Sequence, residues 1–122
     1  MLVSYLKAKI HRATVTDANL DYEGSITIGR ELIESAGLHP FEQVDIYNVT
    51  NGERFHTYVI PGAAGVICLN GAAAWKAKPK DLVIIASYCW LDEEEARAHK
   101  PRLVYLGEGN HIKWVASEVA EQ

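Results

Sequence analysis

The segment Val44–Ile60, with the sequence VDIYNVTNGERFHTYVI, decides the fold class of this chain. Apolar and polar residues alternate through Val44–Val49 and again through Arg54–Ile60, which is the period-two pattern of a half-buried strand. Asn51-Gly52 stands between the two runs, and this dipeptide favours the tight turn of a β-hairpin. The segment therefore predicts two antiparallel strands.

The same pattern recurs in short pieces on both sides of this hairpin. Further strands are expected at Leu2–Val15, Ile26–Ile28, Val66–Leu69, Leu82–Trp90 and Arg102–Leu106. Short helices are expected at Arg30–Ala36, which Gly37 ends, at Ala72–Lys76, and at Glu93–His99, which Asp92 caps. Asp17–Ser25 and Gly107–Asn110 are expected to be turns, and the tail after them to be frayed. A mainly β fold follows, and a small closed barrel is favoured because closure removes exposed strand edges.

Composition limits the class of protein. The chain has 122 residues, of which 48% are hydrophobic, so one domain spanning residues 1–122 is expected. The net charge is −4 and the basic residues form no blocks, which argues against nucleic-acid binding. No apolar run approaches the roughly 20 residues that span a membrane. With no signal-peptide pattern at the N-terminus, a cytoplasmic location is expected. Cys68 and Cys89 make no zinc motif, and no metal is expected.

Taken singly, the polar residues have ordinary structural explanations. Lys9 and His11 lie two apart, so a strand places both on one face, where they would usually be solvated. Arg54, His56 and Tyr58 share a face of the hairpin's second strand for the same reason, and cross-strand pairing would explain them. These residues acquire a functional meaning only as a set.

Four motifs occur in order along the chain. They are Lys9-x-His11-Arg12, Tyr22-Glu23-Gly24-Ser25, the run Asn48–Tyr58, and Asn70-Gly71-Ala72-Ala73-Ala74. In this order and at these separations they resemble the aspartate 1-decarboxylase family, and the resemblance extends from about Lys9 to Ala98. It implies a six-stranded double-psi β-barrel that assembles as a homotetramer with active sites between subunits. It also implies a carboxy-lyase that makes β-alanine and CO₂ from L-aspartate for pantothenate biosynthesis.

The resemblance implies that the chain is a zymogen that makes its own cofactor. Autocatalytic cleavage between Gly24 and Ser25 would give a short chain, 1–24, and a long chain, 25–122, with Thr57 and Asn70 assisting. Ser25 would become a pyruvoyl group, which forms a Schiff base with L-aspartate and serves as an electron sink. Neither pyridoxal phosphate nor a metal is then required. Whether a helper protein assists maturation stays open.

The resemblance also implies roles in substrate binding and proton transfer. Tyr58 would return a proton to the substrate, and Arg54 and Lys9 would bind its carboxylates. The other expected substrate contacts are His11, Thr57, Gly71, Ala72 and Ala73. Thr57 does not share a strand face with Arg54 and Tyr58, and two explanations stay open, a bulge or a site built between subunits.

Three functions remain in competition at this point. The first is the self-processing decarboxylase. The second is an uncleaved, non-catalytic barrel that acts as a binding or interaction module. The third is a decarboxylase for a different acidic amino acid such as glutamate, because one methylene changes pocket affinity by only about 1–3 kcal/mol. The chain also departs from the family at Trp75, where relatives more often carry His, and the resemblance thins beyond Pro101.

Overall fold

The structure is a computed structural model that describes residues 1–120. Its elements in chain order are β1 (Val3–Thr14), β2 (Asp17–Asn19), β3 (Ser25–Gly29), α1 (Arg30–Ala36), β4 (Gln43–Asn48), β5 (Arg54–Gly62), β6 (Ile67–Asn70), the 3-10 helix η1 (Gly71–Trp75), β7 (Leu82–Leu91), α2 (Glu93–Ala98), β8 (Arg102–Leu106), the 3-10 helix η2 (Glu108–Asn110) and β9 (Ile112–Ala116). The prediction of a mainly β fold with short helices is confirmed.

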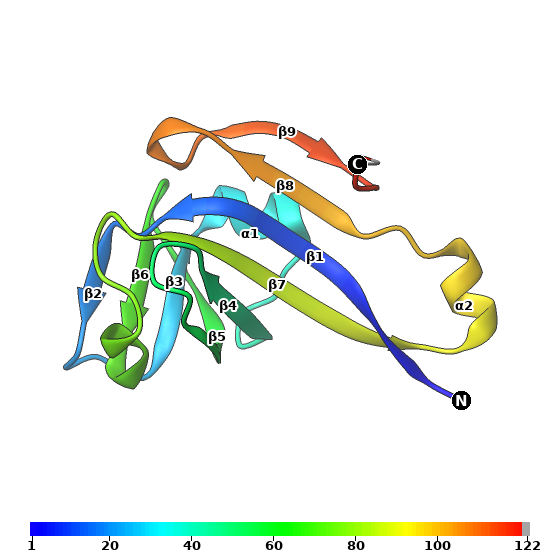
Figure 1. Ribbon diagram of the computed structural model, residues 1–122, viewed down its shortest axis with the longest axis horizontal. Coiled ribbons are helices and arrows are strands. Elements are labelled where there is room, and N and C mark those ends of the chain that lie inside the picture. The colour runs from blue at the N-terminus through cyan, green and yellow to red at the C-terminus, as the bar shows by residue number, and fades with distance from the viewer. Residues whose placement is uncertain (121–122) are drawn as a thin grey trace.

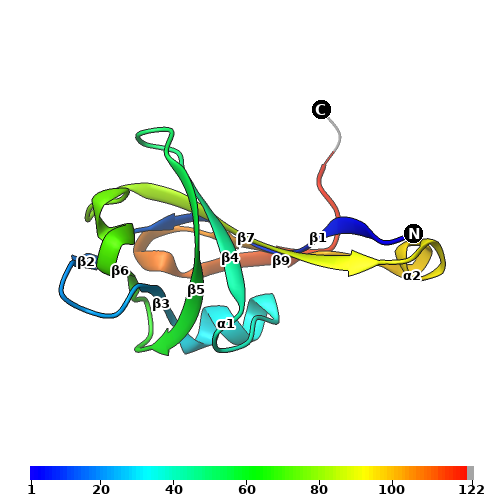
Figure 2. The ribbon, with the colours of Figure 1, turned by 90° about the horizontal axis from the view of Figure 1, so that it is seen from below.

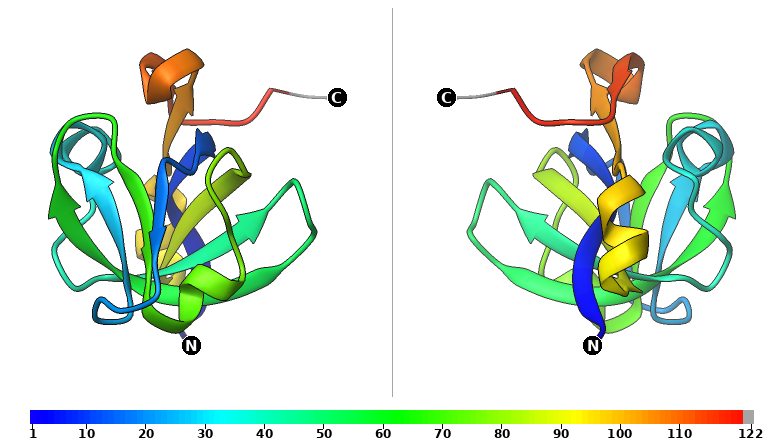
Figure 3. Two further views of the ribbon diagram at one scale, coloured as in Figure 1. Left: turned by 90° about the vertical axis from the view of Figure 1, so that its left-hand side faces the viewer. Right: turned by 90° about the vertical axis from the view of Figure 1, so that its right-hand side faces the viewer.

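The strands form one sheet in the order β2-β6-β3-β5-β4-β7-β1-β8-β9 (Figure 1). β4 and β5 pair antiparallel, from Gln43 opposite Tyr58 to Tyr47 opposite Arg54, as the alternation around Asn51-Gly52 predicts. Three pairs are parallel, namely β1 with β8, β2 with β6 and β3 with β5. Figure 3 shows the sheet end on, strongly curved, with β3 and β5 on one side and β7 on the other.

The expectation of a closed barrel of six strands is not confirmed. Nine strands take part, and the order of paired strands ends at β2 and at β9 instead of returning to its start. Alternation along the chain predicts where strands form, but closure depends on pairing between strands that are distant in sequence. Local patterns therefore could not establish whether the sheet closes.

Polar contacts nevertheless join the two halves of the curved sheet. The Thr16 amide, just beyond β1, donates to the Ile67 carbonyl at 2.8 Å, and the Ile67 amide donates to Thr16 Oγ1 at 3.0 Å. The Asn110 side chain binds both the amide and the carbonyl of Thr14 and also the carbonyl of Gly65. Because Asn110 is almost fully buried, these bonds satisfy polar groups that would otherwise be costly to bury.

The core lies inside the curve of the sheet, and α1 packs against it. Inward-facing residues such as Ile10, Ile26, Ile46 and Ile85 are buried, as strand alternation requires. Burial of each such side chain stabilises the fold by roughly 1.5–3 kcal/mol. α1 presents three buried residues to strands from both halves of the sheet. It ends as predicted at Gly37, which has a left-handed φ of 70°.

A long arm extends from this core. β1 and β7 continue as a pair far beyond the other strands and carry α2 at the tip, as Figure 2 shows from below. Asp92 and Glu95 form a reciprocal capping box at the start of α2, in agreement with the predicted cap. The arm exposes several large apolar side chains, namely Leu2, Val3, Tyr5, Tyr88 and Trp90.

Two segments differ from their predicted structure. Asp17–Asn19 forms the short strand β2 on β6 rather than part of a turn. Ile112–Ala116 forms β9 on β8, where a frayed tail was expected. Both are sheet edges with few buried residues, so their sequences lack the alternation that reveals a strand. Within residues 1–120, no helix has the length and apolar character needed to cross a membrane.

Candidate functional site

Ser25 is the first residue of β3 and lies opposite Asn70, the last residue of β6. Thr27 lies opposite Cys68 in the same antiparallel pair. The residues between them, such as Ile26 and Leu69, face the core. Strand alternation therefore places Ser25, Thr27, Cys68 and Asn70 together on the face opposite the core, and we call these four residues the β3–β6 polar cluster.

The Ser25 hydroxyl is held by two hydrogen bonds. It donates to the Glu23 carbonyl at 2.9 Å and accepts from Asn70 Nδ2 at 3.0 Å. Ser25 is only 1% exposed, whereas Gly24 is exposed. The bond to Glu23 turns the hydroxyl back along the chain, towards the carbonyl two residues earlier. A buried serine hydroxyl with a fixed orientation thus directly follows an exposed glycine in the chain.

Close backbone packing fixes the loop before Ser25. Gly71 has a φ of +66°, and a Cβ added to it would lie 2.7 Å from the Gly24 Cα and 2.8 Å from the Gly24 nitrogen. Both the left-handed backbone and this close approach require glycine at position 71. At Gly24 an added Cβ would meet nothing within 4 Å, so space alone does not require glycine there.

A pocket of about 420 Å³ opens next to Gly24. Its wall includes Thr57 and Tyr58 from β5 and Ala72 and Ala73 from η1. Five of the residues expected from the sequence therefore meet here. The volume is within the range of small-molecule sites. Lys76, which the sequence did not suggest, also lines the pocket and pairs with Glu53 at 2.9 Å.

Lys9 and His11 lie together but in a different pocket. Both line a hollow of about 800 Å³ with Tyr105 and Trp114, and this hollow shares no residue with the pocket beside Gly24. Burial lowers the pKa of His11, and the positive charges of Lys9 and Arg12 lower it further. His11 Nδ1 is buried and makes no hydrogen bond within residues 1–120. The structure thus confirms that these two side chains share a strand face, and it places them in a different pocket from the one beside Gly24.

Arg54 lies apart from both pockets. Its guanidinium stacks over the Tyr47 ring at 4.1 Å, and the Tyr47 and Tyr88 hydroxyls are 2.7 Å apart. Burial and the bond to Tyr47 raise the pKa of Tyr88 to about 12, so the Tyr88 hydroxyl keeps its proton at neutral pH. A cation held on an aromatic face in this way has a fixed position from which to meet an anion. Tyr47 lies opposite Arg54 in the β4–β5 pair, but neither Tyr47 nor Tyr88 was among the site residues expected from the sequence.

Thr57 and Tyr58 both line the pocket although they are neighbours on β5. They lie opposite Val44 and Gln43 in a regular register with β4 that contains no shift from Arg54 to Tyr58. The bulge that would explain their shared role finds no support in this pairing. The alternative, a site built from more than one subunit, stays open.

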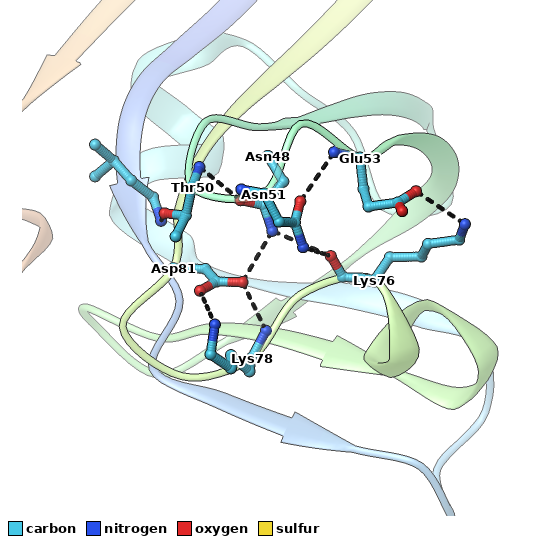
Figure 4. Close-up of polar contacts among 8 residues, drawn as sticks. Asn48, Thr50, Asn51, Glu53, Lys76, Lys78 and Asp81 are labelled. Carbon is cyan, nitrogen blue, oxygen red and sulfur yellow. Dashed lines mark hydrogen bonds and ion pairs between the residues drawn. The ribbon is translucent and has the colours of Figure 1, made fainter.

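A buried polar network supports the pocket wall (Figure 4). Asn48 Nδ2 donates to Asp81 at 2.9 Å and to the Lys76 carbonyl at 3.1 Å, and Asn48 Oδ1 accepts from the amides of Thr50 and Asn51. These bonds tie the β4–β5 hairpin to the end of η1, which carries Ala72 and Ala73. Asn48 continues the buried face of Val44 and Ile46 on β4, and Asp81 directly precedes β7, so only Asn48 stood out as a polar residue in an apolar strand pattern.

Among residues 1–120, no three or more His, Cys, Asp or Glu side chains are grouped as they would be around a metal ion.

Comparison with known proteins assigns the chain to a family. The family model described as aspartate decarboxylase matches residues 1–113. The aspartate 1-decarboxylase of Clostridium kluyveri is 55% identical over 114 residues, which are 92% of this chain and 90% of that protein. The Syntrophus aciditrophicus protein of the same name is 62% identical over 110 residues, 88% of this chain and 95% of its own length. The aspartate 1-decarboxylase of Caulobacter vibrioides is 55% identical over 118 residues, which are 95% of this chain and 100% of that protein. This chain belongs to the aspartate decarboxylase family.

Proposed function

We propose that this chain is the precursor of an enzyme that converts L-aspartate to β-alanine and CO₂ for pantothenate biosynthesis, after cleaving itself between Gly24 and Ser25. The proposal rests chiefly on one observation. In a chain of this family, the Ser25 hydroxyl is buried and held at 2.9 Å from the Glu23 carbonyl and 3.0 Å from Asn70. Such a fixed hydroxyl is suited to attack the neighbouring peptide bond.

Self-cleavage begins when Ser25 Oγ attacks the carbonyl carbon of Gly24. The C–N bond breaks as the C–O bond forms, the hydroxyl proton passes to the nitrogen, and residues 1–24 are then held as an ester. Residue 25 then loses its α-proton, and the ester bond to its side chain breaks. Residues 1–24 leave with a terminal carboxylate, and residue 25 becomes dehydroalanine. One water molecule then converts dehydroalanine to the pyruvoyl group and releases ammonia. Burial of Ser25 keeps bulk water away from the ester.

Asn70 and Thr57 are proposed to assist the first step. Asn70 already donates to Ser25 Oγ, so its amide is placed to stabilise negative charge that develops beside that atom. Thr57 lines the pocket next to Gly24 and brings a hydroxyl that can donate a hydrogen bond. The tight packing of Gly71 on Gly24 restricts the movement of the loop that carries the carbonyl.

The surroundings of position 25 fit a pyruvoyl group. Gly24, the residue directly before β3, lines the pocket together with Thr57 and Tyr58, so a group at position 25 would be one residue from a space open to a small substrate. When present, the pyruvoyl group takes up the electron pair that the substrate α-carboxylate leaves behind as CO₂. Tyr58 is the proposed proton donor to the substrate α-carbon, as the family resemblance implies, because it lines this pocket and its phenol has a proton to donate.

The two substrate carboxylates call for cationic partners. Arg54 can bind one of them with two parallel hydrogen bonds, and Lys9 offers a point charge for the other. Since Lys9 and His11 line one pocket while Thr57 and Tyr58 line another, a site that uses all of them requires two subunits. A homotetramer with active sites between subunits, as the family resemblance implies, meets this requirement. The exposed apolar side chains of the β1–β7 arm give such an assembly a surface to bury.

Further features implied by the resemblance belong to this proposal as well. We expect residues 1–122 to act as a single domain in the cytoplasm. We also expect the curved sheet to have the double-psi connectivity of the family, and the parallel pairing of β1 with β8 and β3 with β5 is compatible with such crossings.

The experiment that tests the proposed activity is a product assay on the purified, matured protein. Supplied with L-aspartate, it should release CO₂ and β-alanine with no added pyridoxal phosphate. A parallel assay with L-glutamate should give much slower turnover. Turnover on glutamate alone would reassign the substrate. Absence of product from either amino acid, with the chain intact, would favour a non-catalytic binding module.

A further inference from the structure

The β3–β6 polar cluster holds the Asn70 amide by three side-chain contacts rather than one. Asn70 Nδ2 donates both to Ser25 Oγ at 3.0 Å and to Thr27 Oγ1 at 2.9 Å. On the other side of the amide, Cys68 Sγ lies 3.3 Å from Asn70 Oδ1 and donates to it. Asn70 is 2% exposed, so its polar atoms rely on these partners rather than on bulk water.

The orientation of this amide matters for the chemistry at Ser25. The oxygen and nitrogen ends of an asparagine amide have almost the same shape, so its hydrogen-bond partners determine which end faces where. Rotated by 180°, the amide would present Oδ1 instead of an N–H group to Ser25 Oγ. It would then repel, rather than stabilise, negative charge beside that oxygen.

Thr27 is itself held in place. Its Cγ2 methyl lies 2.3 Å from the position that a Cβ on Gly62 would occupy, so the methyl fills the space that this glycine leaves. With the methyl packed on Gly62, the hydroxyl is on the side of Asn70 and accepts its second N–H. Threonine thus has a specific fit at this position, because its methyl and its hydroxyl are each used.

Cys68 completes the arrangement from the opposite strand. Burial raises the pKa of its thiol, and the negative charge of Asp17 raises it further, so the sulfur keeps its proton at neutral pH. The thiol is 3.9 Å from the Leu69 carbonyl and 3.3 Å from Asn70 Oδ1, and the shorter contact is the one to the amide. A thiol is a weak donor and a weak acceptor, but its single S–H is used only when the oxygen end of the amide faces it, which favours the observed orientation.

We propose that Thr27 and Cys68 are positioning residues for self-cleavage, which act by holding the Asn70 amide with its N–H group towards Ser25. The inference rests on the proposed function, since it assigns these residues to the maturation of the same site. Neither residue touches the bond that breaks. Both act on the rate through the orientation of a third side chain.

The test is the rate at which freshly purified precursor splits into two chains, followed by intact mass. Thr27→Val keeps the shape but removes the acceptor, and should cleave about tenfold more slowly, the effect of losing one typical hydrogen bond. Thr27→Ser keeps the hydroxyl and should restore most of the rate. Cys68→Ala should slow cleavage by about threefold, because a thiol is a weak donor, and Cys68→Ser should cleave faster than Cys68→Ala.

Thr16→Val is the matched control. It removes a hydroxyl that also binds β6, through the backbone of Ile67, but that does not contact Asn70. It should lower the thermal midpoint without changing the cleavage rate of the folded protein. A purely structural role for Thr27 would instead make Thr27→Val and Thr16→Val behave alike.

The outcomes separate this inference from the proposed function. Wild-type chain that never cleaves overturns the proposed function, and the inference with it. If the wild type cleaves and Thr27→Val cleaves at the same rate, the inference alone is overturned. It is also overturned if Thr27→Val and Thr27→Ser are slowed equally. If Thr27→Val does not fold, the two Cys68 variants provide the test. Cleavage of Cys68→Ala at the wild-type rate then overturns the inference.

Discussion

At the scale of single residues, the site depends on a few polar groups that the strands hold out of water. Ser25 and Asn70 face each other across β3 and β6, and each is almost fully buried. Leaving either group without its partner would cost about 1–3 kcal/mol. The same bond that stabilises this part of the sheet therefore fixes the proposed nucleophile, and the two effects require separate measurements.

Tyr58 allows cleavage and decarboxylation to be separated. Its phenol is proposed to donate a proton to the substrate and has no part in breaking the Gly24–Ser25 bond. Tyr58→Phe should therefore mature into two chains as the wild type does, but kcat for β-alanine formation should fall by at least about 100-fold. Intact mass and the product assay on one preparation measure both steps. Unchanged turnover would remove Tyr58 from the mechanism.

Gly71 gives a second prediction at this scale. Gly71→Ala would place a Cβ 2.7 Å from the Gly24 Cα, so the loop before Ser25 must shift and self-cleavage should be largely lost. Gly52→Ala is the control, because Gly52 has a similar φ of +80° but open space around it. That variant should lose only about 1 kcal/mol of stability and should cleave normally. Normal cleavage by Gly71→Ala would show that the close approach has no functional role.

At the scale of elements, the β4–β5 hairpin is the part that sequence reasoning described best. The alternation and Asn51-Gly52 predicted both strands and their pairing, because a hairpin depends only on neighbouring residues. The same holds for α1 and its end at Gly37. β9 was missed because Ile112–Val115 are all exposed and show no alternation of burial.

The sequence predicted the candidate site less completely than the hairpin, because part of the site depends on pairing between distant strands. The family motifs indicated Ser25 and Asn70, and the β3–β6 register places them together. Thr27, Cys68 and Tyr47 carry no motif of their own. Thr27 contacts Asn70 across the β3–β6 pair, whereas Cys68 is near Asn70 on the same strand and Tyr47 lies opposite Arg54 in the β4–β5 hairpin. Spacing along the chain contains no information about the Thr27–Asn70 contact, because that contact depends on the register between β3 and β6.

The cap of α2 gives a prediction at the element scale. Asp92 accepts from the Glu95 amide at 2.8 Å, and α2 contains no buried residue. Asp92→Ala should therefore weaken α2 by about 0.5–2 kcal/mol, and the loss should be confined to local opening of the helix. Hydrogen exchange of the α2 amides should speed up while the thermal midpoint changes little. Asp92→Ser keeps an acceptor and should behave like the wild type. A large fall in the midpoint would mean that α2 supports the core.

At the scale of the whole molecule, the placement of the site residues and the exposed arm both favour an assembly of several subunits. Lys9 and His11 are separated from the pocket beside Gly24, and the arm leaves Tyr88 and Trp90 exposed. Large apolar side chains grouped on a surface usually mark a contact with another chain. An assembly that covers the arm would account for both features, which is why the oligomer belongs to the proposed function.

A second whole-molecule feature is the carboxylate of Glu42, which links three segments. It accepts hydrogen bonds from Lys7 on β1, Ser87 on β7 and the His39 amide. Burial raises the pKa of Glu42, but the bonds from Ser87, Lys7 and His39 outweigh it and hold the pKa below its usual value. A carboxylate with a depressed pKa in the folded state contributes stability that is present above its unfolded pKa, near ~4.3, and is lost as the pH falls through the folded value.

Glu42→Gln should therefore destabilise the protein by about 1–3 kcal/mol at neutral pH. The difference from the wild type should shrink as the pH falls below about 4.3, where the wild-type carboxylate takes up its proton. Urea unfolding at a series of pH values measures this. Glu34→Gln, which changes an exposed carboxylate on α1, should have little effect at any pH. A Glu42→Gln deficit that stays constant down to pH 3 would contradict the linkage.

The central claim is that Ser25 breaks its own backbone and becomes a pyruvoyl group, and intact mass spectrometry of purified wild-type protein tests it most directly. The account predicts two chains, residues 1–24 and a chain starting at position 25 that reacts with carbonyl-specific reagents. It also predicts that Ser25→Ala remains a single unlabelled chain. A folded wild-type sample with the mass of 122 unmodified residues and no carbonyl labelling would contradict it.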